Sequence, residues 1–345
     1  MARPAVAPSA HALLKVNSSS SPAVSRGRRL AARRHVLDVF SYGGAHYDRV
    51  LLLRLNELRD VVDRHVLLEL NAPLSLNRDF VHSHAVSQTW DATAPCFRRF
   101  ASRILHVALD GARLLNRTQH AATAQAIMRT TGFALALERA LPQGSDDAWV
   151  LLSDIDEIPR AAILHSMLSN TSLLSALEAG ATFTLEGTTC YYTVDCCAPT
   201  GSREASWLAG PKLLTSESLR RSSWERIRRS HVSGPSDPHV VRQASWHFGF
   251  LMSPREQLTK VCLNTDPIVR QSCARGEDAV LAMVMHATSR CRDLWNRSSV
   301  PLRRLRPAVR HTFVPDFVNG HLDSFTEINA PLDIYTTSGV CSAPD

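Results

Sequence analysis

The chain lacks the signals of a nucleic-acid-binding protein and of a membrane-spanning one. Its formal net charge of +7 comes from residues 1–35, which hold seven basic residues and no acidic one, so residues 36–345 are formally neutral. A neutral body has no basic surface to follow a phosphate backbone, so we expect no nucleic-acid binding. No apolar run approaches the roughly 18 residues of a transmembrane helix.

The motifs of several common binding sites are also missing. The chain has no G-x-G-x-x-G and no G-x-x-x-x-G-K-S/T segment, so the Rossmann dinucleotide and P-loop interpretations lack their fingerprints. Its eight cysteines include no paired C-x-x-C, which argues against a zinc ribbon. An even number of cysteines and four N-glycosylation sequons, at Asn17, Asn116, Asn170 and Asn296, together favour a luminal compartment with some disulfides.

Composition divides the chain into three parts. Residues 1–35 are rich in Ala, Ser, Pro and Arg and are expected to be a disordered tail, a transit-like peptide or the remnant of an anchor and stem. Residues 36–325 are predicted to form the globular domain, and 326–345 a C-terminal tail.

Strand and helix patterns alternate through the first half of this domain. Apolar runs predict strands at 35–42, 64–71, 102–110 and 148–153, and helical spacing predicts helices at 48–63, 120–141 and 161–169. Such alternation is typical of an α/β fold with a mostly parallel central sheet and helices on both faces. Ligands of these sheets bind beyond the carboxyl ends of the strands.

Three acids, Asp154, Asp156 and Glu157, directly follow the strand predicted at 148–153. Their mutual repulsion must be offset, and carboxylates at i and i+2 can supply oxygen ligands to a divalent cation that bridges substrate phosphates. The alternative is a solvated acidic turn that caps the helix at 161–169. An aspartate phosphatase is less favoured, because its D-x-D normally follows the first strand of the fold.

The segment VLLSDIDEIPR (150–160) resembles the defining segment of glycosyltransferase family 17, the β-1,4-mannosyl-glycoprotein 4-β-N-acetylglucosaminyltransferases. Four other segments are similar to blocks of the same family, in the same order: 51–71, SWHFGFLMSPREQLTKV (245–261), CRDLWNR (291–297) and FVPDFV (313–318).

This resemblance implies a GT-A-like fold that transfers N-acetylglucosamine from UDP-GlcNAc to a core mannose of N-glycans, with inversion and a β-1,4 linkage. It also implies a divalent cation, Mn²⁺ or Mg²⁺, and a place in the Golgi lumen, with membrane association only through an anchor that this sequence does not contain. Two other hypotheses remain open, a glycan-binding protein without turnover and a metal-dependent phosphohydrolase.

The resemblance also assigns candidate residues to the donor site. Asp154 and Asp156 match the metal and diphosphate site, and His247 would complete the metal's coordination or touch the diphosphate, although a histidine between aromatic residues is often part of a core. The remaining donor-site candidates are an acid of the motif, a helix arginine and two residues at a strand's end: Glu157, Arg129, Glu69 and Asn71.

An inverting transfer needs a general base, for which Asp278 is the candidate and Glu277 the alternative. Both acids could equally belong to the first turn of a helix. Tyr191, Tyr192 and Trp207 are candidates for an aromatic platform that stacks on the acceptor sugar, or for ordinary core residues.

Overall fold

The computed structural model describes residues 34–70, 90–110, 128–141, 148–198, 206–222, 224–229, 237–262, 271–292, 302–304 and 315. All described elements belong to one compact unit that begins at Arg34. Residues 1–33 of the tail predicted at 1–35, the tail predicted at 326–345 and the candidate Asn71 lie outside the described residues. His35, which was assigned to the tail, begins the first strand.

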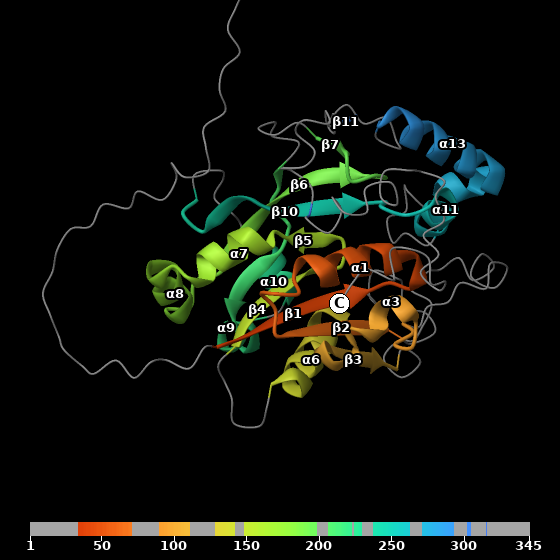
Figure 1. Ribbon diagram of the computed structural model, residues 1–345. Coiled ribbons are helices and arrows are strands. Elements are labelled where there is room, and N and C mark those ends of the chain that lie inside the picture. The colour runs from red at the N-terminus through yellow and green to blue at the C-terminus, as the bar shows by residue number, and fades with distance from the viewer. Residues whose placement is uncertain are drawn as a thin grey trace, which may run out of the picture. The chain divides into compact units, whose positions relative to one another are not determined.

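Four parallel strands form the first half of the sheet: β1 (His35–Tyr42), β2 (Arg64–Leu70), β3 (Ile104–Leu109) and β4 (Ala148–Asp154). They lie in the order β4-β1-β2-β3, so β1 is paired on both sides (Figure 1). All four strands were predicted, since each contains an apolar run of strand length; β1, β2 and β4 are buried on both faces, whereas β3 is partly exposed.

The second half of the sheet has mixed pairing. β9 (Lys212–Thr215) runs antiparallel to both β4 and β6 (Phe183–Tyr191), and β6 pairs in parallel with β10 (Val240–Gly249). A short strand, β5 (Glu157–Pro159), returns antiparallel to β10. The remaining strands are β7 (Cys196–Cys197), β8 (Ser206–Trp207) and β11 (Arg303–Arg304). The four longest ladders among the described residues are parallel, which confirms an α/β fold with a mostly parallel sheet.

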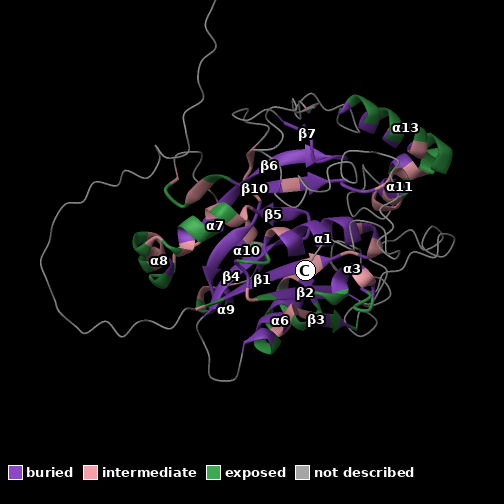
Figure 2. Cartoon of the chain, in the orientation of Figure 1, coloured by how far each residue is buried: buried purple, intermediate pink, exposed green. Residues whose placement is uncertain are grey.

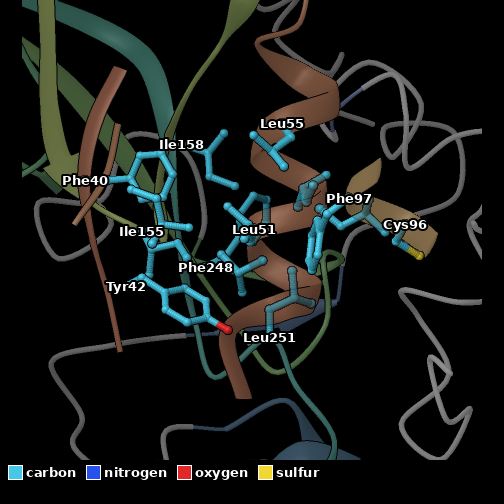
Figure 3. Close-up of a cluster of buried hydrophobic side chains, with 14 of the residues drawn as sticks. Phe40, Tyr42, Leu51, Leu55, Cys96, Phe97, Ile155, Ile158, Phe248 and Leu251 are labelled. Carbon is cyan, nitrogen blue, oxygen red and sulfur yellow. The ribbon is translucent and has the colours of Figure 1, made fainter. Parts of the chain in front are cut away.

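Helices cover one face of the parallel strands through alternate residues of β1. Figure 3 shows Phe40, Leu51 of α1 (Asp48–Glu57) and Phe97 of α3 (Pro95–Arg98) as members of one apolar cluster, with α1 between Phe40 and Phe97. Side chains of a strand alternate between its two faces, so this helix layer takes every second residue of β1.

The intervening residues of β1, Leu37 and Val39, point to the opposite face. There they join a second cluster with residues of α6 (Phe133–Ala140) and α10 (Trp224–Arg229). Both faces of β1 are therefore buried, as its colouring in Figure 2 shows.

The remaining described helices connect or flank these layers. They are η2 (Ala45–Tyr47), η3 (Ala101–Arg103), η4 (Met128–Gly132), α7 (Ala161–Leu168), α8 (Thr171–Glu178), α9 (Ser216–Arg220), α11 (Pro254–Cys262), η6 (Ser272–Arg275) and α13 (Glu277–Arg290). No helix in the described ranges is long and apolar enough to cross a bilayer.

Two predicted helices have different bounds in the structure. The helix predicted at 48–63 ends at Glu57, and the following residues form turns whose apolar side chains still pack into the core. The helix predicted at 120–141 is described only from 128, where the π-helical turn η4 leads into α6. Gly132 lies at that junction because a Cβ there would be 2.7 Å from a methyl group of Leu68.

Disulfides link the carboxyl-terminal elements, as the even number of cysteines led us to expect. Cys196 of β7 is bonded to Cys291 at the end of α13, and Cys262 of α11 to Cys273 of η6. A further bond joins Cys190 to Cys197, and Cys96 is also disulfide-bonded.

Candidate functional site

The three acids lie where the order of the parallel strands changes direction. The chain passes from β1 to β2 and β3 on one side and then returns to place β4 on the other side of β1. Ser41 at the end of β1 is paired with Asp154 at the end of β4. Open α/β sheets bind ligands beyond the carboxyl ends of the strands at such a switch point. Asp154 therefore lies at the position where sheets of this kind bind ligands.

A tight β4–β5 turn holds the acids together. Asp154 ends β4, Asp156 lies in the turn, and Glu157 begins β5. The Asp154 amide donates a hydrogen bond of 3.0 Å to Glu157 Oε2, and the Phe248 amide of β10 donates one of 2.7 Å to the Asp156 carbonyl. The turn is thus fixed both internally and by the neighbouring strand.

The acids do not cap the following helix, so that alternative is wrong. The N-cap residue of α7 is Arg160, and the amide of Ala161 in its first turn donates a hydrogen bond of 2.8 Å to Glu57 Oε1. The carboxylates of the β4–β5 turn are directed to other partners.

Two arginines offset the charge at one end of this turn. Arg129 Nη2 lies 2.8 Å and Arg228 Nη1 2.7 Å from Asp154 Oδ2, and Arg228 Nη2 lies 3.0 Å from Glu157 Oε1. Arg129 comes from the π-helical turn η4, an irregularity often found at functional sites, and Arg228 comes from α10. Asp154 is thus shared between two cations from separate elements.

A lysine offsets the negative charge of Asp156 in the same turn. Lys260 Nζ of α11 lies 3.0 Å from Asp156 Oδ2, and it also lies over the rings of Tyr47 and Phe250, at 4.8 and 4.9 Å from their centroids. We call these six charged residues the ion-pair cluster: Asp154, Asp156, Glu157, Arg129, Arg228 and Lys260. In the described structure, basic side chains supply the positive charge that the sequence led us to expect from a metal.

Burial and charge shift the protonation equilibria of the cluster in different directions. Burial, with help from the charges of Asp154 and Asp156 and against that of Arg228, raises the pKa of Glu157 to about 7. Burial also acts to raise the pKa of Asp156, but the positive charge of Lys260 outweighs it and the pKa is lowered. Near neutral pH, Asp156 is therefore ionised whereas Glu157 is partly protonated.

A fully buried arginine holds the backbone of the β4–β5 turn. Arg54 Nη1 donates to the carbonyl oxygens of Asp154, Ile155 and Glu157, at 3.1, 3.3 and 2.9 Å. Its other nitrogens bind Asp38 of β1, and despite burial these interactions lower the pKa of the Asp38 carboxyl to about 2. Asp38 and Arg54 therefore form an ionised pair that positions the backbone of the acids.

His247 and Trp207 flank the cluster. Their rings stack with centroids 4.0 Å apart and an interplanar angle of 17°, and Trp207 Nε1 donates to Glu157 Oε1 at 2.7 Å. Burial lowers the pKa of His247 to about 4, so the imidazole is neutral at pH 7. Its Nδ1 is shielded from solvent and has no hydrogen-bond partner among the described residues.

Asp154, Asp156 and His247 are the side chains that would have to hold a divalent cation. The described residues contain no preformed group of three or more His, Cys, Asp or Glu side chains arranged around a metal position. The donor chemistry nevertheless fits, since a neutral imidazole nitrogen and two carboxylates are ordinary ligands of such ions. Asp154 could serve only if Arg129 and Arg228 release its oxygens.

The structure brings some of the remaining candidates close to the cluster and leaves others apart. Glu69, the second-last residue of β2, is paired with Tyr42 of β1; it accepts a hydrogen bond from the Trp90 amide at 3.2 Å and lies 2.6 Å from His106 Nε2. Tyr191 contacts the His247 ring edge-on, with centroids 6.3 Å apart. Tyr192 is buried in the cluster around α11 and α13, and its hydroxyl donates to a backbone carbonyl.

The candidates for the general base lie on another element. Glu277 and Asp278 occupy the first turn of α13, as predicted, and both are exposed. No hydrogen bond or ion pair joins Asp278 to the ion-pair cluster in the described structure.

Sequence reasoning missed Arg228, Lys260 and Arg54. Nothing near Arg228 distinguishes it from its arginine neighbours in α10. Lys260 carried a usable signal, since the chain has only three lysines and lysine is rarely buried unless paired.

Comparisons with known proteins leave the family open. No protein-family model and no curated protein matches the chain. A solved structure, the glycosyltransferase GlyE of Streptococcus pneumoniae TIGR4, aligns with 61% of this chain and 45% of its own length, at 10% identity and a TM-score of 0.26. The chain thus spans less than half of that structure, and at this TM-score no argument rests on the likeness. The resemblance to glycosyltransferase family 17 stays a prediction from sequence.

Proposed function

We propose that the chain is an inverting glycosyltransferase that moves N-acetylglucosamine from UDP-GlcNAc to a core mannose of N-glycans with a β-1,4 linkage. The observation that carries the proposal is the set of acids and cations gathered at the switch point between β1 and β4. The family resemblance of the surrounding segments supplies the donor, the acceptor and the luminal setting.

The proposed reaction forms a bond between the acceptor oxygen and the anomeric carbon while the bond from that carbon to the diphosphate breaks. In this reaction the departing diphosphate would bind Arg129, Arg228 and Lys260, because guanidinium and ammonium groups pair well with phosphate oxygens. A divalent cation, Mn²⁺ or Mg²⁺, would be held by Asp154, Asp156 and His247 and would stabilise the negative charge that develops on the diphosphate.

The acceptor hydroxyl must lose its proton, and we propose Asp278, or else Glu277, as the base that takes it. Trp207 lies against Glu157 and His247, where its exposed part could line the sugar site. Glu69, near the end of β2, is suited to bind the nucleoside.

The direct test is UDP release from UDP-GlcNAc with and without an N-glycan acceptor and Mn²⁺, followed by mass analysis of the glycan. Transfer that requires the acceptor and adds one N-acetylhexosamine supports the proposal. Ligand binding without any turnover would favour a glycan-binding protein, and phosphate release from a monoester would favour a phosphohydrolase.

The general base is tested with Asp278→Asn and Glu277→Gln, which keep the shape of the side chains and remove the charge. The base variant should lose about 100-fold or more in kcat with an unchanged melting temperature. Glu217→Gln serves as the control, because Glu217 is an exposed residue of α9 paired with Arg221. Full activity in both variants would remove α13 from the mechanism.

A further inference from the structure

One of the four N-glycosylation sequons lies within the described part of the chain. Asn170, Thr171 and Ser172 form it at the junction between α7 and α8, and the other three sequons fall outside the described ranges. Thr171 and Ser172 are exposed, and Asn170 is half-buried. A sequon is only a three-residue pattern, so the conformation of Asn170 decides whether its amide nitrogen is open to modification.

The two ends of the Asn170 side-chain amide have different environments. Asn170 is the N-cap residue of α8, and its Oδ1 accepts hydrogen bonds from the Ser172 and Leu173 amides at 3.0 and 3.2 Å. Its Nδ2 has no hydrogen-bond partner among the described residues and is not shielded from solvent. The oxygen therefore caps the helix, whereas the nitrogen, the atom to which an N-linked glycan is attached, faces water.

A glycan on Asn170 stands clear of the ion-pair cluster. Glu178, the last residue of α8, lies 3.5 Å from Arg34, directly before β1, so the end of α8 lies by the amino end of that strand. Asp154 is paired with Ser41, near the opposite, carboxyl end of β1. Figure 1 likewise shows α7 and α8 on the side of the molecule away from α11 and α13.

We propose that Asn170 carries an N-linked glycan on Nδ2 while its Oδ1 continues to cap α8. In this modification Nδ2 gives up one proton and forms a bond to the anomeric carbon of a lipid-linked oligosaccharide, the co-reactant. The bond from that carbon to the lipid diphosphate breaks, and the lipid diphosphate leaves. The disulfides between described cysteines agree with the oxidising compartment in which such transfer occurs.

Position 171 offers a matched pair of variants. Proline at the middle position of a sequon abolishes it, whereas alanine keeps it. Thr171 is the first residue of α8, where proline is well tolerated because the amide at that position has no partner within the helix. Asn170 has φ −92° and ψ 107°, an extended conformation that a following proline allows. Thr171→Pro should therefore remove the glycan and keep α8 folded, and Thr171→Ala should keep both.

The test is site-specific mass analysis of the full chain, secreted from eukaryotic cells behind a cleavable signal peptide. Enzymatic release of glycans in heavy-oxygen water converts each modified asparagine to a labelled aspartate, so the peptide that contains Asn170 reports its occupancy. Most molecules of the wild type and of Thr171→Ala should be modified there, and those of Thr171→Pro and Ser172→Ala should not. An unmodified Asn170 in the folded, secreted wild type, or equal modification in Thr171→Pro, would overturn the proposal.

The cap is tested with a second pair of variants, at position 170. Neither can be glycosylated, but Asn170→Asp keeps an oxygen that accepts from the Ser172 and Leu173 amides, whereas Asn170→Ala has none. Asn170→Asp should melt with Ser172→Ala, which has an intact cap and no glycan, and Asn170→Ala should melt about 2 °C lower. Equal melting temperatures in all three would refute the division of roles within this amide.

The outcome is separate from that of the proposed function, because these measurements involve no nucleotide sugar and no turnover by this chain. A glycan on Asn170 of a chain that transfers no sugar would overturn the proposed function and leave the modification site in place. Sugar transfer by a chain with an unmodified Asn170 would overturn the modification site alone.

Discussion

Replacing Arg54 by methionine should destabilise the fold strongly and disturb the β4–β5 turn. The guanidinium of Arg54 is fully buried and donates two hydrogen bonds to Asp38, one to Ser153 Oγ and three to backbone carbonyls of the turn. Methionine fills much of the same volume but satisfies none of these acceptors. It leaves the Asp38 carboxylate buried, with His65 as its remaining side-chain partner among the described residues.

Removing one partner of a buried ion pair costs about 3–5 kcal/mol, so Arg54→Met should lower the free energy of unfolding in urea by that amount. Arg59→Met is the control, because Arg59 forms an exposed pair with Asp60 and such pairs contribute at most about 1 kcal/mol.

The double variant Asp38→Asn, Arg54→Met separates the charge effect from the lost packing. It removes both charges, so it should be more stable than Arg54→Met alone by about 2 kcal/mol. If Arg54→Met costs under about 1 kcal/mol, or if the two changes simply add, the pair does not hold the turn as the distances indicate.

The lowered pKa of Asp38 also predicts how the stability of the fold changes at acidic pH. Its pKa falls from 3.8 to about 2 on folding, so its contribution to stability is present above pH 4 and is lost as the pH falls through 2. The shift corresponds to about 2 kcal/mol. The double variant should lack this loss, measured as the difference between its urea unfolding curves and those of the wild type at pH 4 and pH 2.

Two further predictions concern the cluster and its surroundings. Folding raises the pKa of Glu157 from 4.5 to about 7, so the contribution of Glu157 to stability should decline as the pH rises across that interval. Folding lowers the pKa of His247 from 6.5 to about 4, so the contribution of His247 should grow as the pH rises from 4 to 6.5. In Glu157→Gln only the histidine contributes, so the free energy of unfolding should rise between pH 4.5 and pH 6.5. In His247→Gln only the glutamate contributes, so the free energy of unfolding should fall over the same interval. Equal slopes in the two variants would refute the assignment. Replacing Cys262 and Cys273 by alanine should cost about 3 kcal/mol in urea unfolding and weaken UDP binding, because Lys260 lies two residues before the disulfide in α11; unchanged UDP affinity would show that the disulfide does not position the lysine.

The parallel half of the sheet was predictable because its strands are continuous apolar runs. The half with mixed pairing was not, and β6 shows the reason. Four of its nine residues, Thr184, Glu186, Thr188 and Thr189, are polar and yet buried. Their burial depends on partners from distant segments, such as the Lys212 ammonium that donates to Thr184 Oγ1 at 2.8 Å. A pattern search along the chain cannot register such pairs.

The helix predicted at 48–63 was too long for a related reason. Leu58, Val61 and Val62 continue the helical spacing of apolar residues, and all three are buried. They reach the core from turns, since the Asp63 carboxylate accepts a hydrogen bond from the Val36 amide of β1 at 2.7 Å and fixes the chain there. Periodicity thus identified the buried residues correctly but not the conformation that buries them.

The acids of the β4–β5 turn illustrate the same limit at the site. Their crowding required a counter-charge, and the sequence could state that requirement because the acids are contiguous. It could not identify the source, because the cations come from η4, α10 and α11, elements that folding alone brings together.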